Sequence, residues 1–182
     1  MDPILLATLL KVALPAAATL IVLVVAAKRR VSRVDDLGFR RPTRAMIAAW
    51  LALWLVWLAA SEFLIRHFGL EQAKAWPAYP VHIVLLRILA IGVLGPFAEE
   101  TVMRGIVFFQ IRRKLGNAHA AIVIVALLWA AMHYAYGPGT VALIVADGTL
   151  FGYARHRGGS LWIPIAMHVL GNLISIGQSL TT

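Results

Sequence analysis

The sequence predicts an all-α membrane protein, a polytopic bundle of about six transmembrane helices in which one helix is kinked or broken. Hydrophobic residues fill 61% of the 182 positions and charged residues only 14%, whereas soluble domains average about 45–50% and about 25%. The mean hydropathy is +0.82. The apolar residues also gather into runs near the length of about 20 residues that spans a bilayer. We expect a single transmembrane domain over residues 1–182.

The expected spans follow from these apolar runs. They are Ile4–Ala27, Met46–Ile65, Val81–Phe109, Ala118–Tyr134, Thr140–Tyr153 and Leu161–Leu180. The third is too long for one straight span, since at about 1.5 Å per residue it covers roughly 43 Å, against about 30 Å of hydrocarbon. Gly95-Pro96 lies inside it, and proline removes a helical hydrogen bond. We therefore expect a kink or break just before Glu99.

The basic residues mark alternate connections between the spans. Lysine and arginine gather at positions 28–44, 112–114 and 155–157, and the other connections hold few of them. The positive-inside rule places these three connections in the cytoplasm and both termini outside. No basic residue precedes the first apolar run and no clear small-residue cleavage site follows it, so we expect no signal peptide.

The net charge of +9 comes from 17 basic and 8 acidic residues. In a soluble protein this excess would suggest nucleic acid, but no basic amphipathic face or aromatic-basic pattern is present here. We expect membrane lipids and no nucleic acid as partners. The chain has no cysteine, which excludes disulfides, thiolate zinc sites and a cysteine nucleophile.

Ionisable residues inside spans are costly and are therefore functional candidates. Glu99, Glu100 and Arg104 stand in the third span. Glu100 and Arg104 are four residues apart, so they share a helix face and can form an ion pair. Glu99 points about 100° away from Glu100 and is free to face another group. Alone, this cluster is equally consistent with a structural salt bridge and a spare carboxylate.

Three further polar side chains lie in the fourth and sixth spans. His133 ends the fourth, and His168 and Asn172 are four residues apart in the sixth. Each has a structural alternative, an interfacial histidine or an interhelical hydrogen bond. Measured from the basic connections, Glu99 and His133 lie roughly 20 and 22 Å deep, and His168 and Asn172 roughly 12 and 18 Å deep. These overlapping depths favour one common site.

Such a set of side chains suits hydrolysis. A carboxylate in a low-dielectric interior readily accepts a proton from water. A nearby imidazole can orient that water or protonate a leaving amine, and an amide and a second imidazole can donate hydrogen bonds to an oxyanion. The chain has neither a Gly-x-Ser-x-Gly nucleophile setting nor a His-Glu-x-x-His zinc helix.

These motifs resemble the CAAX prenyl-protease and bacteriocin-processing family of intramembrane proteases, also called the Abi family. The family pattern is Glu-Glu-x-x-x-Arg, then aromatic-x-x-x-His, then His-x-x-x-Asn. In this sequence it reads Glu99-Glu100 to Arg104, Trp129 to His133, and His168 to Asn172. The resemblance covers about residues 81–178, the expected catalytic core. Trp129 stands where many members have phenylalanine.

The resemblance implies an intramembrane endopeptidase of the glutamic type. It implies that Glu99 is the general base and that His133 works with it on the water. His168 and Asn172 would then support the oxyanion.

The resemblance also implies that Arg104 stabilises Glu100 and the helix packing. Family members are described both as metalloproteases and as glutamic proteases. We expect no cofactor, with a zinc ion held by Glu99, His133 and His168 as the alternative.

The substrate expected from the resemblance is a protein or peptide with a hydrophobic or lipidated segment. Prenylated proteins, leader peptides and C-terminal sorting helices all remain open. Because only two spans precede the family-like part, a compact member of a prokaryotic inner membrane is expected.

Two other functions remain as alternatives. One is a non-catalytic scaffold or bacteriocin-immunity protein that keeps the motifs for packing. The other is a transporter that uses Glu99, Asp147, Lys11 and Arg87 as an ion path. Transporters usually show paired repeats, and none is visible here.

Overall fold

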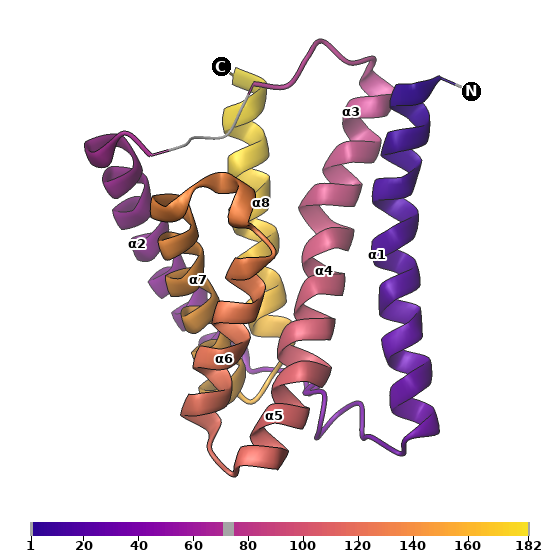
Figure 1. The fold of residues 1–182 in the computed structure, drawn as a ribbon, viewed down its shortest axis with the longest axis vertical. Helices are drawn as coiled ribbons and strands as arrows, with labels where there is room; N and C mark the ends of the chain where they lie inside the picture. The colour runs from indigo at the N-terminus through magenta and orange to yellow at the C-terminus, as the bar shows by residue number, and fades with distance from the viewer. Residues whose placement is uncertain (1, 71–74, 182) are drawn as a thin grey trace.

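The computed structural model describes residues 2–70 and 75–181, and over these residues it contains helices and connections and no strand (Figure 1). The α-helices are α1 Pro3–Lys28, α2 Arg44–Phe68, α3 Val81–Arg87, α4 Gly95–Glu100, α5 Phe108–Leu115, α6 Ala118–Ala131, α7 Pro138–Gly158 and α8 Trp162–Thr181. Two π-helical segments, η1 Ile88–Leu94 and η2 Thr101–Val107, and one 3-10 turn, η3 Tyr134–Tyr136, complete the set. The predicted all-α polytopic fold is confirmed.

Within residues 2–70 and 75–181, four helical columns are long and apolar enough to cross a membrane: Pro3–Lys28, Arg44–Phe68, Val81–Leu115 and Trp162–Thr181. The two remaining predicted spans correspond to α6 and α7. With 14 residues, α6 reaches about 21 Å, which is shorter than the hydrocarbon core of about 30 Å. By contrast, α7 has 21 residues but includes Asp147, Arg155 and Arg157.

The third predicted span is one helical column of 35 residues. The irregularity predicted before Glu99 is present, but it takes the form of π-helical turns rather than a break in the chain. In η1 the Gly95 N–H donates to the carbonyl of Ala90, five residues back. Pro96, which has no N–H, follows at once. Such π-helical turns are often found at functional sites.

Local signals set several helix ends. The Thr43 hydroxyl accepts a hydrogen bond from the Met46 N–H and begins α2, while Gly69 ends it in the left-handed conformation. Gly116, with φ of 65°, ends α5, and the Asn117 side chain then caps α6. This tight reversal places α6 beside the column that carries the glutamates.

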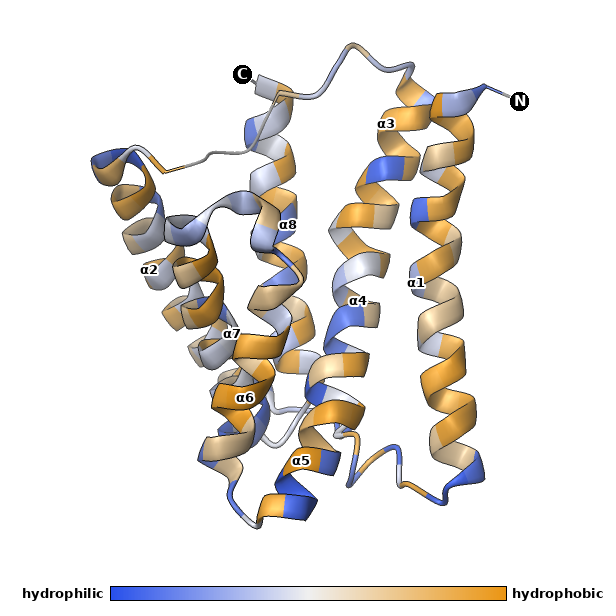
Figure 2. Cartoon of the chain, viewed as in Figure 1, coloured by the Kyte–Doolittle hydropathy of each residue, from blue (hydrophilic) through white to orange (hydrophobic). Residues whose placement is uncertain are grey.

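Hydrophobic residues predominate along the helices (Figure 2), and many large apolar side chains are exposed on the outside of the bundle. Along α1 only Thr8 and Ala26 are buried, and Leu14, Leu20 and Ile21 are strongly exposed. This pattern is that of a lipid-facing surface. The buried core lies among α2, η2, α5, α6, α7 and α8. It consists of Trp54, Met103, Phe108, Ala121, Ile122, Val125, Trp129, Phe151, Ala154, Ile163 and Met167.

The three basic connections lie at one end of the bundle, and both ends of the chain lie at the other (Figure 1). This arrangement agrees with the alternation of charge along the sequence. We call the two ends of the bundle the basic end and the terminal end. The assignment of the basic end to the cytoplasm stays a prediction.

Reporter fusions would check that assignment. Fusions after Arg33, Arg113 and Arg157 are expected to be active on the cytoplasmic side, and a fusion at residue 182 on the outer side. Paired alkaline phosphatase and fluorescent-protein reporters give opposite signals on the two sides and control for expression. A cytoplasmic signal at residue 182 would contradict the predicted orientation.

Candidate active site

Glu99 and Glu100 are the last two residues of α4, between the two π-helical segments. Figure 2 shows this hydrophilic turn of α4 among apolar turns. The Glu99 carboxylate accepts a hydrogen bond from the indole N–H of Trp129 on α6, with Oε2 and Nε1 2.8 Å apart. A phenylalanine at position 129 would have no such donor. Trp129, which stands where many family members have phenylalanine, therefore binds the candidate base Glu99.

Glu100 turns away from Glu99 into a fully buried ion-pair network. Its Oε1 lies 3.0 Å from Nη1 of Arg104 and 3.0 Å from Nδ1 of His168. The pairing with Arg104 agrees with the four-residue spacing, whereas the contact with His168 was not predicted from the sequence. Since both Glu100 and Arg104 have no exposed surface, each needs the other as a partner.

The Arg104 guanidinium is enclosed by α6 and α7. Its Nη2 donates to the carbonyl of Gly148, at 3.2 Å, and its central carbon lies 4.5 Å from the Trp129 ring and 5.4 Å from the Phe151 ring. Both rings are close enough for cation–π attraction. A Cβ atom at Gly148 would lie 3.1 Å from Ala126 and from Arg104 Nη2. Glycine at this position therefore allows α6, α7 and the guanidinium to approach so closely.

The hydrogen bonds of the two histidines fix their tautomers. Nδ1 of His133 lies 2.9 Å from the carbonyl oxygen of Trp129, and Nδ1 of His168 lies beside the Glu100 carboxylate. Because both partners only accept hydrogen bonds, each Nδ1 carries a proton. In a neutral ring, Nε2 is then an acceptor. His133 lies beyond the end of α6 at Ala131, so the fourth helix is shorter than predicted.

The Asn172 side chain forms a hydrogen bond with the backbone of the third span, a contact that was not predicted from the sequence. Its Nδ2 donates to the carbonyl of Ile91 in η1, at 2.9 Å. In a π-helical turn that carbonyl would pair with the N–H of residue 96, but residue 96 is proline. The N–H of Gly95 is already bonded to Ala90. Asn172 thus satisfies a carbonyl that Pro96 leaves without a donor.

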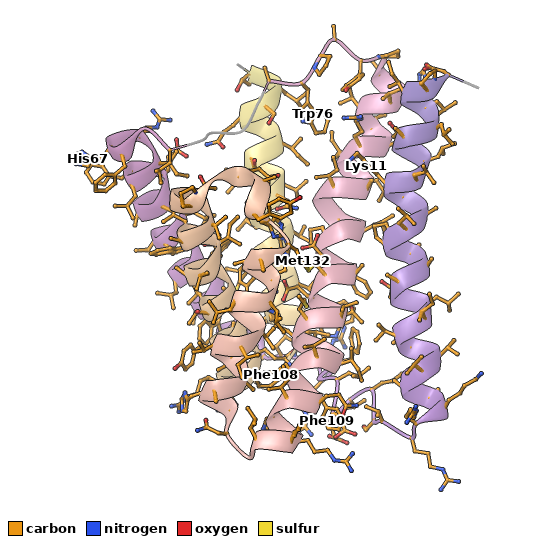
Figure 3. The ribbon with its side chains drawn as sticks, in the orientation of Figure 1. Lys11, His67, Trp76, Phe108, Phe109 and Met132 are labelled. Carbon is orange, nitrogen blue, oxygen red and sulfur yellow. The ribbon has the colours of Figure 1, made fainter. Side chains whose placement is uncertain are left out.

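Glu99, His133, His168 and Asn172 line one cavity of about 790 Å³. The structure thus brings together the four predicted catalytic residues, from α4, α8 and the turn that follows α6. The cavity also reaches Trp76, which Figure 3 shows toward the terminal end.

Asp147 on α7 also lines this cavity. Its Oδ1 accepts a hydrogen bond from the indole N–H of Trp57, at 2.5 Å. The signal in the sequence is an acidic residue within an apolar run. Arg87 belongs to a different cluster, where its Nε donates to the Thr8 hydroxyl at 3.3 Å and its guanidinium lies over the Tyr79 ring. The four residues of the transporter alternative are therefore not gathered along this cavity.

The zinc alternative requires three ligands at close range. Among residues 2–70 and 75–181, no group of three histidine, aspartate or glutamate side chains is placed to hold a metal ion. Nδ1 of His133 and of His168 is bonded to a protein acceptor, which leaves Nε2 of each ring as the nitrogen that could bind a metal ion. The expectation that the site needs no cofactor therefore stays a prediction.

An apolar helical bundle with a buried carboxylate network beside a cavity that Glu99, His133, His168 and Asn172 line defines a polytopic membrane protein with a candidate hydrolytic site. The chain belongs to the family described as type II CAAX prenyl endopeptidase Rce1-like, whose model matches residues 80–174. This range contains all three motifs.

The chain is also similar to an uncharacterized 24.3 kDa protein of Escherichia coli. The two are 32% identical over 128 residues, which are 64% of this chain and 58% of that protein. The chain thus spans little more than half the length of that relative. No solved structure matches the chain.

Proposed function

We propose that the protein is an intramembrane endopeptidase that hydrolyses a peptide bond in a membrane-associated or C-terminally tailed protein or peptide. The main support is the shared cavity, which Glu99, His133, His168 and Asn172 line within an apolar bundle. Membership of the prenyl endopeptidase family supports the same reaction class.

In the proposed reaction, Glu99 acts as the general base. Its carboxylate removes a proton from a water molecule while the water oxygen attacks the carbonyl carbon of the substrate. Nε2 of His133, as an acceptor, receives a hydrogen bond from the same water and orients it. The proton held by Glu99 then passes to the amine as the carbon–nitrogen bond breaks.

The oxyanion needs hydrogen-bond donors. Nδ2 of Asn172 donates one hydrogen to Ile91, so its second hydrogen is the candidate donor. With Nδ1 protonated toward Glu100, Nε2 of His168 donates only when the ring is an imidazolium. In this proposal Glu100 and Arg104 support the site through His168 and do not touch the substrate.

The substrate proposed for this cavity carries a hydrophobic or lipidated segment and enters from the surrounding membrane, which we propose to be a prokaryotic inner membrane. A helical segment hides its carbonyl groups in its own hydrogen bonds, so it has to unwind before attack. The cavity offers aromatic walls, including Trp54 and Phe151, for the unwound segment.

Coexpression with candidate tailed substrates would test the proposed function. Prenylated tails, leader peptides and C-terminal sorting helices are expected to give a cleaved product with the wild type and none with Glu99→Ala. Mass spectrometry of the product identifies the bond that is cut. With purified protein, we expect cleavage to persist in the presence of a zinc chelator.

Two results would contradict parts of this proposal. Cleavage by Glu99→Ala at the wild-type rate would favour the scaffold alternative, with the cut made by another enzyme. Loss of cleavage with the chelator, restored by added zinc, would favour the metal-dependent reaction.

A further inference from the structure

A second cavity, of about 510 Å³, lies at the basic end of the bundle. Arg112 and Arg113 at the end of α5 and Arg155 near the end of α7 line it, together with Asp35 and Asp36 from the connection between α1 and α2. Phe108 and Phe109 form its apolar wall, and Figure 3 shows both toward the end opposite Trp76. None of these residues belongs to the proposed hydrolytic site.

Arg155 is a buried cation that has no acidic partner among the described residues. Its residue is only 6% exposed, and its Nη2 donates to the backbone carbonyl of Asp36 at 3.1 Å. Its Nε is buried and has no hydrogen-bond partner, and no carboxylate of residues 2–70 or 75–181 forms a salt bridge with it. Burying an unpaired charge is costly, so this arginine needs an anion.

The connection between α1 and α2 is shaped around this arginine. Gly38 adopts φ of 86°, and a Cβ atom there would collide with the Arg155 guanidinium. Positive φ favours glycine, so the backbone can lie directly against the guanidinium. The side chain is therefore held at the cavity by its surroundings and does not extend freely into solvent.

The acidic residues of this cavity are already engaged. Asp35 forms a salt bridge with Arg40, at 2.8 Å, and Asp36 accepts a hydrogen bond from the backbone N–H of Ser32, at 2.8 Å. Arg112 and Arg113 form no salt bridge with the described residues. Three arginines thus line the cavity, and of its two carboxylates only that of Asp36 has no cationic partner among the described residues. The cavity therefore has an excess of positive charge.

We propose that this cavity binds a phosphate group. Guanidinium groups bind phosphate oxygens through paired, charge-assisted hydrogen bonds. The cavity lies at the end of the bundle where basic loops mark the membrane surface, and its phenylalanine wall continues into the apolar core. Basic pockets between helices at this level bind anionic headgroups. The phosphate comes either from the headgroup of an anionic phospholipid or from a soluble phosphate compound.

Binding to the purified protein tests this proposal and does not depend on peptide cleavage. The protein in neutral maltoside detergent is titrated with phosphatidylglycerol, with phosphatidylcholine and with inorganic phosphate, and binding is followed by native mass spectrometry and thermal unfolding. We expect Arg112→Gln/Arg113→Gln to weaken binding about thirtyfold, because each basic residue near a lipid surface contributes about fivefold in affinity and the two factors multiply. Both side chains are exposed, so folding is retained.

The matched control is Arg41→Gln/Arg44→Gln, which removes the same charge from exposed positions at the same end. We expect it to bind as the wild type does. Preference for phosphatidylglycerol alone identifies the headgroup as the source, and equal stabilisation by inorganic phosphate identifies a soluble phosphate; both support the proposal. An absence of binding by either anion, or equal losses in the two double variants, would overturn it.

Discussion

Glu99→Gln is expected to lower the rate of peptide cleavage by about 10²–10⁴-fold, the usual loss when a general base is removed. Glutamine keeps the shape of the side chain, and its carbonyl oxygen can still accept the hydrogen bond from Trp129 that the structure shows. It cannot accept the proton of the water. The initial rate of product formation with a reconstituted tailed substrate measures the effect.

The folded state of this variant provides the control. We expect the thermal unfolding temperature of Glu99→Gln in detergent to match that of the wild type, because Glu99 is not part of the Glu100–Arg104 ion pair. Retention of more than about a tenth of the wild-type rate would remove Glu99 as the base.

Arg104→Ala is expected to reduce the amount of folded protein as well as the activity. The change leaves the buried Glu100 carboxylate without its arginine and removes the hydrogen bond to Gly148. Breaking a buried pair from one side costs about 3–5 kcal/mol. Yield after gel filtration and thermal unfolding in detergent measure the loss.

Arg157→Ala is the matched control for this loss of an arginine. Arg157 is exposed near the end of α7, and exposed substitutions usually change the free energy of unfolding by less than about 0.5 kcal/mol. Normal folding of Arg104→Ala together with slow cleavage would instead indicate that Arg104 contacts the substrate.

The parts of the fold that depend on one helix at a time could be predicted from the sequence. The apolar runs located the helices, because the length of a lipid-spanning segment is set by the bilayer. The spacing of Glu100 and Arg104 predicted their pairing, because residues four apart share a helix face. Depth along each span predicted overlapping levels for Glu99, the two histidines and Asn172, and the structure places all four on one cavity.

The contacts between helices could not be predicted in the same way. The hydrogen bond between His168 and Glu100 depends on how α8 is rotated relative to α4, and the spacing within one helix does not contain that rotation. The same applies to Trp129, whose indole reaches Glu99 from α6. Hydropathy also predicted that the fourth span extends to Tyr134. The structure ends α6 at Ala131, before the turn that leads to Gly137.

Pro96 in the helical column Val81–Leu115 predicted an irregular helix, but it did not predict which side chain would bond to the carbonyl left without a donor. Pro96 and Asn172 compensate for each other. Pro96 has no N–H to donate to the Ile91 carbonyl, and the side-chain amide of Asn172 donates that hydrogen bond instead. Asn172→Ala in the natural chain therefore removes both a backbone partner and a candidate oxyanion donor. In a Pro96→Ala background, the N–H of residue 96 becomes available to Ile91, so the same change at Asn172 removes the candidate donor alone. The effects of substitutions at the two positions on the free energy of unfolding are therefore coupled. The size of this coupling measures the structural contribution of Asn172 separately from its contribution to the reaction.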